Sequence, residues 1–156
     1  MRTAALTAAL AMAILAPATA ARAQTVAEKK KRAVVDDAAA KVAGDIKDCG
    51  KKFKVAFDWK AFDGLDWKKI GREKNDYYDS EANNLAHLGE GLNQLCADKD
   101  YKAALAKIST IVYRSTNDES IRVKAVISGA TLTLDNYSFG STRDARDYES
   151  AAKAAL

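Results

Sequence analysis

The sequence predicts an α+β fold: a mainly antiparallel sheet of three to four strands with helices packed on one face, closed by one disulfide. Apolar residues recur at helical spacing in two long segments and alternate with polar residues in several shorter ones. The strand-like segments are few and irregularly interspersed with helices, unlike the regular alternation of a doubly wound sheet. Outside the first 23 residues the chain has no proline and no linker-like tract, which indicates a single domain.

The first 23 residues have the form of an export signal. Arg2 gives a positive start, residues 4–16 are apolar apart from Thr7, and Ala21-Arg22-Ala23 has the small-x-small pattern of a signal-peptidase site. The apolar run is shorter than the roughly 20 residues that a membrane-spanning helix needs. We therefore expect residues 1–23 to be removed, leaving a soluble domain at residues 24–156 without a membrane span, in the periplasm or secreted.

The mature chain carries little net charge. Loss of Arg2 and Arg22 with the signal leaves 23 basic and 21 acidic residues. Nucleic-acid binding proteins present a clustered basic face, so we expect no nucleic-acid partner. The one basic run, residues 29–32, could contact anionic lipid, but it is more typical of a solvated helix start.

Helical spacing marks the first long segment. Thr25-Val26-Ala27-Glu28 has the form of a capping box, in which the Thr hydroxyl and the Glu carboxylate satisfy free amides at a helix start. We expect this helix to run to about residue 47 and to end at Gly50. Its apolar stripe consists of Val35, Ala38, Val42, Ile46 and Cys49.

Three further helices are expected. The longest begins between residues 76 and 80, ends near Cys96 and has a leucine face at positions 85, 88, 92 and 95. Gly89 and Gly91 inside it each cost about 1 kcal/mol relative to alanine, which indicates that another backbone packs close there. Residues 98–106 form a short helix, and Ser141 or Thr142 caps a final one.

The strands are predicted from alternation. Residues 53–62 alternate cleanly and predict one half-buried strand that ends at the Asp63-Gly64 turn signal. Phe57-Asp58-Trp59-Lys60 is echoed by Leu65-Asp66-Trp67-Lys68, which fits either a hairpin or a strand followed by a short helix. Residues 108–113, 121–127 and 131–137 are further strands, with a bend or bulge at Ser128-Gly129. The long helical stretch before residue 108 could also carry a parallel crossover.

Cys49 and Cys96 are predicted to form a disulfide, because an isolated pair in an oxidising compartment is usually bonded. Two cysteines and one histidine are too few for a structural zinc site, which takes four ligands. We expect no metal site and no cofactor.

Two sets of residues are weighed for catalysis. His87, the one histidine, could be a general base oriented by Glu90, but it lies off the leucine face and is better interpreted as a surface residue. Seven carboxylates fall between residues 58 and 81, and two of them could flank a glycosidic bond. Lysines and arginines are interspersed among them, which favours a solvated surface.

Aromatic residues are concentrated in one segment. Seven of the twelve lie between residues 53 and 78. Aromatics beside cations are typical of binding hot spots. Phe62 and Trp67 flank the Asp63-Gly64 turn, with Lys60 and Lys68 beside them, so these four residues are the predicted binding site. The alternative is that the aromatics belong to the core.

The sequence therefore favours a small exported domain that acts by binding another envelope or extracellular protein or a small ligand. A small hydrolase that uses carboxylates of residues 58–81, with or without His87, is the alternative. No catalytic motif supports it.

We predict that the mature protein begins at Gln24, because Ala21-Arg22-Ala23 satisfies the small-x-small rule. The competing site is Ala18-Thr19-Ala20. Intact mass of the exported protein decides between them, and a retained signal would contradict the predicted location.

Overall fold

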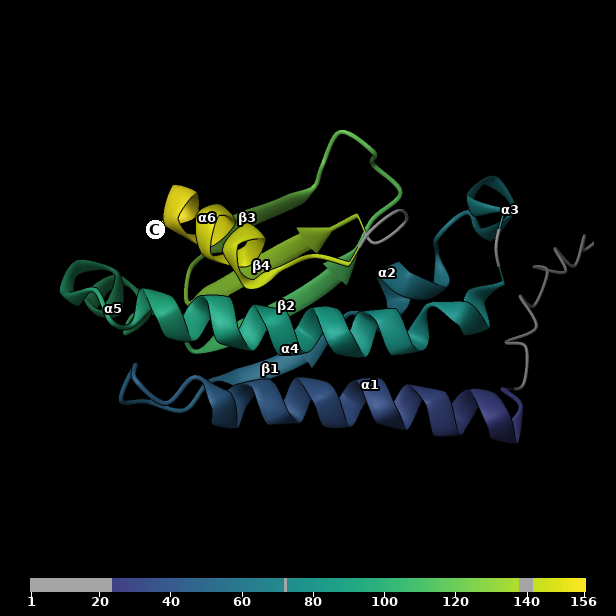
Figure 1. The fold of residues 1–156 in the computed structure, drawn as a ribbon, viewed down its shortest axis with the longest axis horizontal. Coiled ribbons are helices and arrows are strands. Elements are labelled where there is room, and N and C mark those ends of the chain that lie inside the picture. The colour runs from purple at the N-terminus through teal and green to yellow at the C-terminus, as the bar shows by residue number, and fades with distance from the viewer. Residues whose placement is uncertain (1–23, 72, 138–141) are drawn as a thin grey trace, which may run out of the picture.

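The computed structural model describes residues 24–71, 73–137 and 142–156, so the predicted signal at residues 1–23 lies outside them. A four-stranded sheet forms one layer, and the long helices α1, α4 and α6 lie on one face of it (Figure 1). The strands are β1 (Lys54–Phe57), β2 (Thr110–Ser115), β3 (Val123–Ser128) and β4 (Thr131–Asn136). The helices are α1 (Val26–Asp45), α2 (Trp59–Asp63), α3 (Trp67–Ile70), the 3-10 turn η1 (Lys74–Asp76), α4 (Tyr78–Leu95), α5 (Lys99–Leu105) and α6 (Ala145–Ala155).

The sheet is mixed, which corrects the prediction of a mainly antiparallel one. Its strand order is β1-β2-β4-β3, and β2 runs parallel to both β1 and β4. The physical reason lies in the connection: α4 and α5 fill the long segment between β1 and β2, and a connection of that length returns the chain to its starting edge. Among the strands that the structure describes, only β3 and β4 pair antiparallel. Within the described residues, none of the helices has the length and apolar character that crossing a membrane requires.

The chain turns back completely between β3 and β4. Ser128 pairs with Thr131 across a two-residue turn, in which Gly129 takes a φ of +57°. Residues with positive φ are usually glycine, so the turn depends on this residue. The change of direction predicted at Ser128-Gly129 is therefore a hairpin turn and not a bulge within one continuing strand.

The predicted strand at residues 53–62 is wrong in its second half. β1 ends at Phe57, and α2 begins at Trp59 because the Asp58 carboxylate accepts a hydrogen bond from the Ala61 N–H at 3.0 Å. A carboxylate in that position caps a helix and ends the extended backbone. Alternation continued past this point only because a one-turn helix is too short to show its own period.

The repeated sequence around residues 58 and 66 encodes a repeated helix cap. Asp66 caps α3 as Asp58 caps α2, by accepting the N–H of the third helical residue. Each helix begins with a tryptophan, and the residue before each cap, Phe57 or Leu65, is buried. This is the arrangement in which an apolar residue fixes the entry of the chain into a helix. The echo therefore specifies two short helices and not a hairpin.

The other helix ends agree with the sequence in part. Thr25 accepts the Glu28 N–H at 3.1 Å and so caps α1, but the Glu28 carboxylate binds side chains elsewhere. α6 is capped by Asp144 rather than by Thr142: the Asp144 carboxylate accepts the Asp147 N–H, and the Asp147 carboxylate accepts the Asp144 N–H in return. The alternative cap, Ser141, lies outside the described residues. α1 ends at Asp45, two residues before the predicted end, and a turn at residues 48–49 then leads to Gly50.

The core lies between the sheet and the three long helices. α4 is central: its leucine face is fully buried, and it contacts α1 on one side and α6 on the other. The predicted disulfide is confirmed, since Cys49 and Cys96 are bonded with their Cα atoms 4.9 Å apart. It joins the segment that follows α1 to the C-terminal end of α4.

The two interior glycines of α4 have different surroundings. A Cβ on Gly91 would overlap the backbone oxygen of Ala145 and lie 3.1 Å from the Glu149 nitrogen, so α6 packs directly on this residue. At Gly89 the nearest atom to such a Cβ is the Val42 Cγ1 at 3.5 Å, an ordinary contact. The close backbone approach expected from the sequence thus exists at both positions, but it forbids a side chain only at Gly91.

We predict that Gly91→Ala destabilises the protein by about 1–3 kcal/mol, because the helices must move apart. Gly89→Ala is the matched control and is expected to be neutral or to stabilise by up to about 1 kcal/mol through helix propensity. Urea unfolding of both variants measures the difference. Equal effects at the two positions would contradict the close packing of α4 and α6.

Candidate functional site

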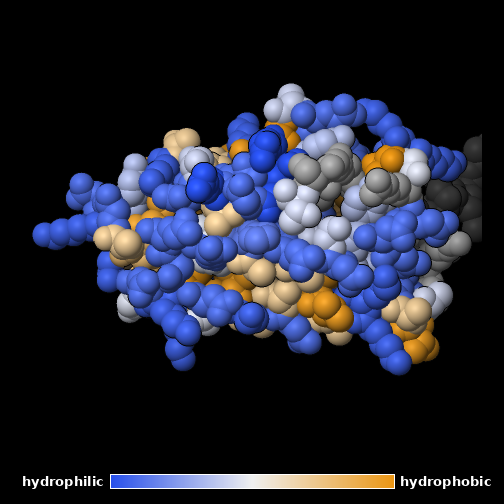
Figure 2. Space-filling model, in the orientation of Figure 1, coloured by the Kyte–Doolittle hydropathy of each residue, from blue (hydrophilic) through white to orange (hydrophobic). Residues whose placement is uncertain are grey.

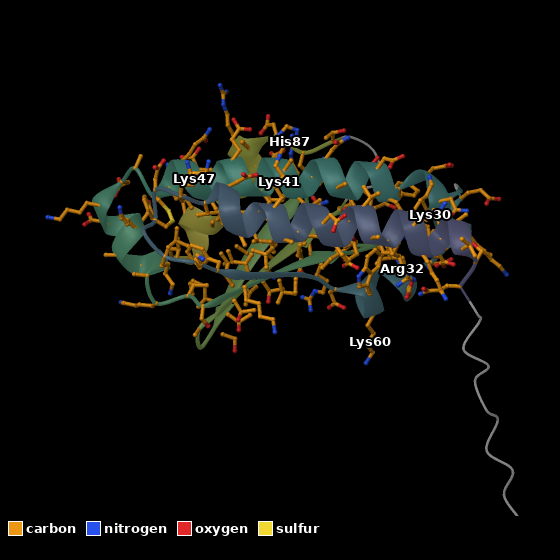
Figure 3. The ribbon with its side chains drawn as sticks, turned by 90° about the horizontal axis from the view of Figure 1, so that it is seen from below. Lys30, Arg32, Lys41, Lys47, Lys60 and His87 are labelled. Carbon is orange, nitrogen blue, oxygen red and sulfur yellow. A yellow bond between two sulfur atoms is a disulfide. The ribbon has the colours of Figure 1, made fainter. Side chains whose placement is uncertain are left out.

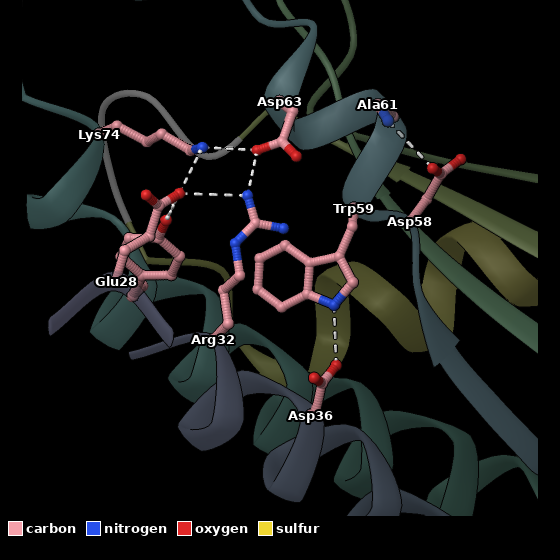
Figure 4. Close-up of polar contacts among 9 residues, drawn as sticks. Glu28, Arg32, Asp36, Asp58, Trp59, Ala61, Asp63 and Lys74 are labelled. Carbon is pink, nitrogen blue, oxygen red and sulfur yellow. Dashed lines mark hydrogen bonds and ion pairs between the residues drawn. The ribbon is translucent and has the colours of Figure 1, made fainter. Parts of the chain in front are cut away.

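The predicted binding segment forms a corner where the start of α1 meets α2 and η1 (Figure 4). The Arg32 guanidinium donates to Glu28 Oε1 at 3.2 Å and to Asp63 Oδ1 at 2.5 Å. Lys74 Nζ donates to the same two oxygens at 3.1 and 2.5 Å. The Tyr78 hydroxyl also donates to Glu28 Oε1, at 3.2 Å. Two cations and two carboxylates thus alternate in a closed, neutral ring, which we call the ion ring.

The ion ring keeps its carboxylates ionised. The hydrogen bond from Lys74 is the main reason that the pKa of Glu28 lies below its usual value, although burial opposes it. Burial also raises the pKa of Asp63, but hydrogen bonds from Arg32 and Lys74 outweigh it and the net pKa is lowered. A general acid needs a raised pKa, so these two carboxylates are set for ion pairing and not for proton donation.

Aromatic rings form the floor of this corner. The Arg32 guanidinium lies 4.4 Å from the centre of the Trp59 ring, and the Trp59 Nε1–H donates to Asp36 at 2.8 Å. Lys74 Nζ is 5.7 Å from the centre of the Phe62 ring. Neither cation was predicted as a site residue: Arg32 lies far before the aromatic segment in sequence, and Lys74, inside that segment, is well separated from the Asp63-Gly64 turn.

The structure brings together only part of the predicted binding site. Phe62 and Trp67 do contact each other, with ring centres 5.0 Å apart. Phe62 is 0% exposed, however, and Trp67 is half-buried against the core. Lys60 is exposed and points away from the molecule (Figure 3), and Lys68 is exposed on α3. Phe62 therefore supports the corner from inside and offers no surface to a partner.

A second polar group lies inside the core, at the carboxyl ends of β2 and β4. Glu81 of α4 is 0% exposed and accepts hydrogen bonds from the Tyr113 hydroxyl at 2.5 Å and the Ser115 hydroxyl at 2.9 Å. The Asn136 amide donates to the Tyr113 hydroxyl. Burial raises the pKa of neighbouring Tyr148 far above its usual value, so its phenol stays neutral. A buried carboxylate needs such donors, and these bonds fix α4 against the strand ends.

Neither candidate for catalysis gains support from its surroundings. His87 lies on the outer side of α4, where its Nδ1 is 3.7 Å from Glu90 (Figure 3). Of the seven carboxylates between residues 58 and 81, Asp58 and Asp66 cap helices, Asp63 belongs to the ion ring and Glu81 is buried. Within the described ranges, no three His, Cys, Asp or Glu residues are placed to hold a metal ion.

The opposite face of the sheet is the other candidate surface, and sequence reasoning did not single it out. In Figure 3 the long helices lie on one side of the sheet, and strand side chains project from the other. We call this side the open face. It carries a central row of small and β-branched residues that are in register across all four strands: Ala56, Val112, Thr133 and Val126. Val126 is 44% exposed, and the other three are half-buried.

Charged side chains form a second row on the open face, near the carboxyl ends of β1, β2 and β4 and the amino end of the antiparallel β3. Arg114 donates to Asp135 through two bonds of 2.5 and 2.9 Å. Lys124 is opposite Asp135 in the register of β3 and β4, and the charge of Asp58 contributes to the raised pKa of Arg114. Across the sheet the signs therefore alternate: Asp58 negative, Arg114 positive, Asp135 negative and Lys124 positive.

The two sides of the molecule differ in character. The helix side is covered mainly by hydrophilic residues, with apolar ones scattered between them (Figure 2). The open face instead combines an ordered apolar row with a charged row.

Comparison of the chain with known proteins found no matching family, no matching curated protein and no matching solved structure.

We predict that Phe62→Ala destabilises the protein by about 3–5 kcal/mol, because a fully buried aromatic ring is removed from a packed cluster. Lys60→Ala, at an exposed neighbouring position, is the control and should change stability by less than about 0.5 kcal/mol. Chemical unfolding measures both. A Phe62→Ala protein of normal stability that fails to bind its partner would restore Phe62 as a contact residue.

Proposed function

We propose that this chain is a small exported domain that acts by binding another protein through the open face of its sheet. The observation that carries the proposal is that β1, β2 and β4 run in the same direction, yet the long helices cover only one side of them. Sheets made entirely of parallel strands are almost always covered on both sides, and three of the four strands of this mixed sheet are parallel. A second protein surface would supply the missing layer.

The side chains of the open face suit a protein partner better than a small ligand. The central row consists of short side chains, since Ala56, Val112 and Thr133 are in register on three adjacent strands. Small-molecule sites are concave, whereas protein interfaces combine an apolar centre with a polar rim. The charged row beside the apolar one supplies such a rim.

The disulfide supports the proposed location. Bonds such as Cys49–Cys96 persist in oxidising compartments and are rare in the cytosol. This agrees with the signal-like sequence at residues 1–23, and both favour a periplasmic or secreted protein.

The test is site-specific photo-cross-linking in the organism that makes the protein. A photoreactive residue replaces Val126 on the open face or, as the matched control, Val34 on the outer side of α1, which is similarly exposed at 49%. We expect protein adducts from position 126 and none from position 34. Adducts in equal yield from both positions, or from position 34 alone, would refute the proposal.

A second variant ties the adduct to the charged row. Lys124→Glu reverses one charge beside position 126 and is expected to lower the adduct yield at least several-fold, since complementary charges guide such contacts. Lys30→Glu on α1 makes the same change on the helix side and should leave the yield unchanged. Identical adduct yields from the two variants would show that formation of the adduct does not depend on the charges of the open face.

A further inference from the structure

We infer that the partner of the open face is a second copy of this chain, related by a two-fold axis that runs parallel to the strands between β2 and β4. The inference rests on the proposed function, because it names the occupant of the same surface. It is carried by the order of charges across the sheet and by the register of the apolar row.

The charged row is complementary to itself under this symmetry. A two-fold axis between β2 and β4 reverses the order of the strands in the second copy. Asp58 then faces Lys124 of the second copy, and Arg114 faces its Asp135. Each sign meets the opposite one at all four positions, which follows only because the signs alternate over an even number of strands. A self-complementary patch is what a two-fold dimer requires.

The inner two charges are already paired within each copy. Arg114 keeps 45% of its side chain exposed, while Asp135 lies beneath it with 12% exposed. Across the axis, each Arg114–Asp135 pair meets an inverted pair, and the outward-facing guanidinium is the group that reaches the second copy. The exposed Lys124 and the half-buried Asp58, whose carboxylate also accepts the α2 cap hydrogen bond, provide the remaining cross-copy contacts.

The uncharged rows permit the two sheets to approach. The axis places Val112 opposite Thr133 of the second copy and Ala56 opposite its Val126. In the outermost row, Thr110 meets Thr131 and Lys54 meets Ser128. No row places like charges or two bulky side chains against each other, and sheets that pack face to face in this way keep their strands nearly aligned.

The size of the face sets the strength of the dimer. Four strands about 4.8 Å apart and six residues long at about 3.3 Å each give a footprint of roughly 400 Å². Stable interfaces bury roughly 800 Å² on each partner, so we expect reversible association that depends on concentration rather than an obligate dimer.

The test uses the purified mature protein alone. Sedimentation equilibrium is measured between roughly 10 μM and 1 mM, a range chosen for weak association. We expect the average mass to rise toward that of two chains. Val126→Arg should weaken association at least tenfold, because it places a bulky charge in the interface, whereas Val34→Arg, on the helix side, should not change it. Raising the salt concentration should also weaken association, since exposed charges are screened.

The symmetry is tested separately from the association. A photoreactive residue at position 126 should cross-link to β1 of the second copy, near Ala56, and peptide mapping of the adduct shows where it attaches. Attachment to a helix, or association that survives Val126→Arg, would overturn the two-fold arrangement. A monomer up to roughly 1 mM would overturn the dimer itself.

The outcomes separate this inference from the proposed function. If purified protein stays monomeric while position 126 still captures a different protein in the producing organism, the open face binds a foreign partner and only the dimer is wrong. If neither purified copies nor cellular proteins attach at position 126, both proposals fail together.

Discussion

The position of α4 is the constraint on which the rest of the structure depends. This helix must touch α1, α6 and the ends of the strands at the same time, and each contact uses a different chemistry. Gly91 lets the backbone of α6 approach, the leucine face fills the core, and Glu81 binds hydroxyls at the end of β2. Because one rigid helix carries all three, moving it for any one of them disturbs the other two.

The buried Glu81 carboxylate places a strict requirement on the packing of α4 against the sheet. A carboxylate in the core is stable only when its oxygens receive hydrogen bonds, and here the donors come from β2, more than thirty residues away in sequence. These hydrogen bonds therefore form only when the strand is in its observed register against the helix. The hydrogen bonds to the carboxylate are directional and so specify one register of the strand, whereas the apolar contacts around it tolerate small shifts in position.

The helices could be predicted from the sequence because their signals are local. Apolar period, caps and glycines placed α1, α4 and α5 within a few residues of their observed bounds. The helical stretch before residue 108 allowed a parallel crossover, but the sequence could not decide for it over antiparallel pairing, because a strand pattern records which side is buried and not which neighbour it pairs with. The short helices α2 and α3 were hidden for another reason: their caps, Asp58 and Asp66, stand where an alternating strand would also place a polar residue.

The candidate site was predicted less well than the fold. Phe62 and Trp67 were predicted to form a binding surface beside the Asp63-Gly64 turn, yet one is core and the other half-buried, because the chain becomes helical after Phe57. The ion ring joins Glu28 to Lys74 across 46 residues, and no local sequence pattern predicts a pair so far apart. The open face was missed because its residues are unremarkable singly: their order of charge acquires meaning only after the strand order is known.

Helices α1 and α4 run side by side in the same direction and are fastened at both ends by different means (Figure 1). At the carboxyl ends the fastening is the covalent Cys49–Cys96 bond, which protons do not affect. At the amino ends it is the ion ring, whose carboxylates have lowered pKa values, so its contribution is complete above their ordinary pKa and is lost as the pH falls through the lowered one. In acid, only the first turns of α1 would lose their attachment, because Val35 and Val42 stay buried in the core and the disulfide holds the other end. Acid therefore weakens the attachment of α1 at one end only, and the end that carries the covalent bond is unaffected.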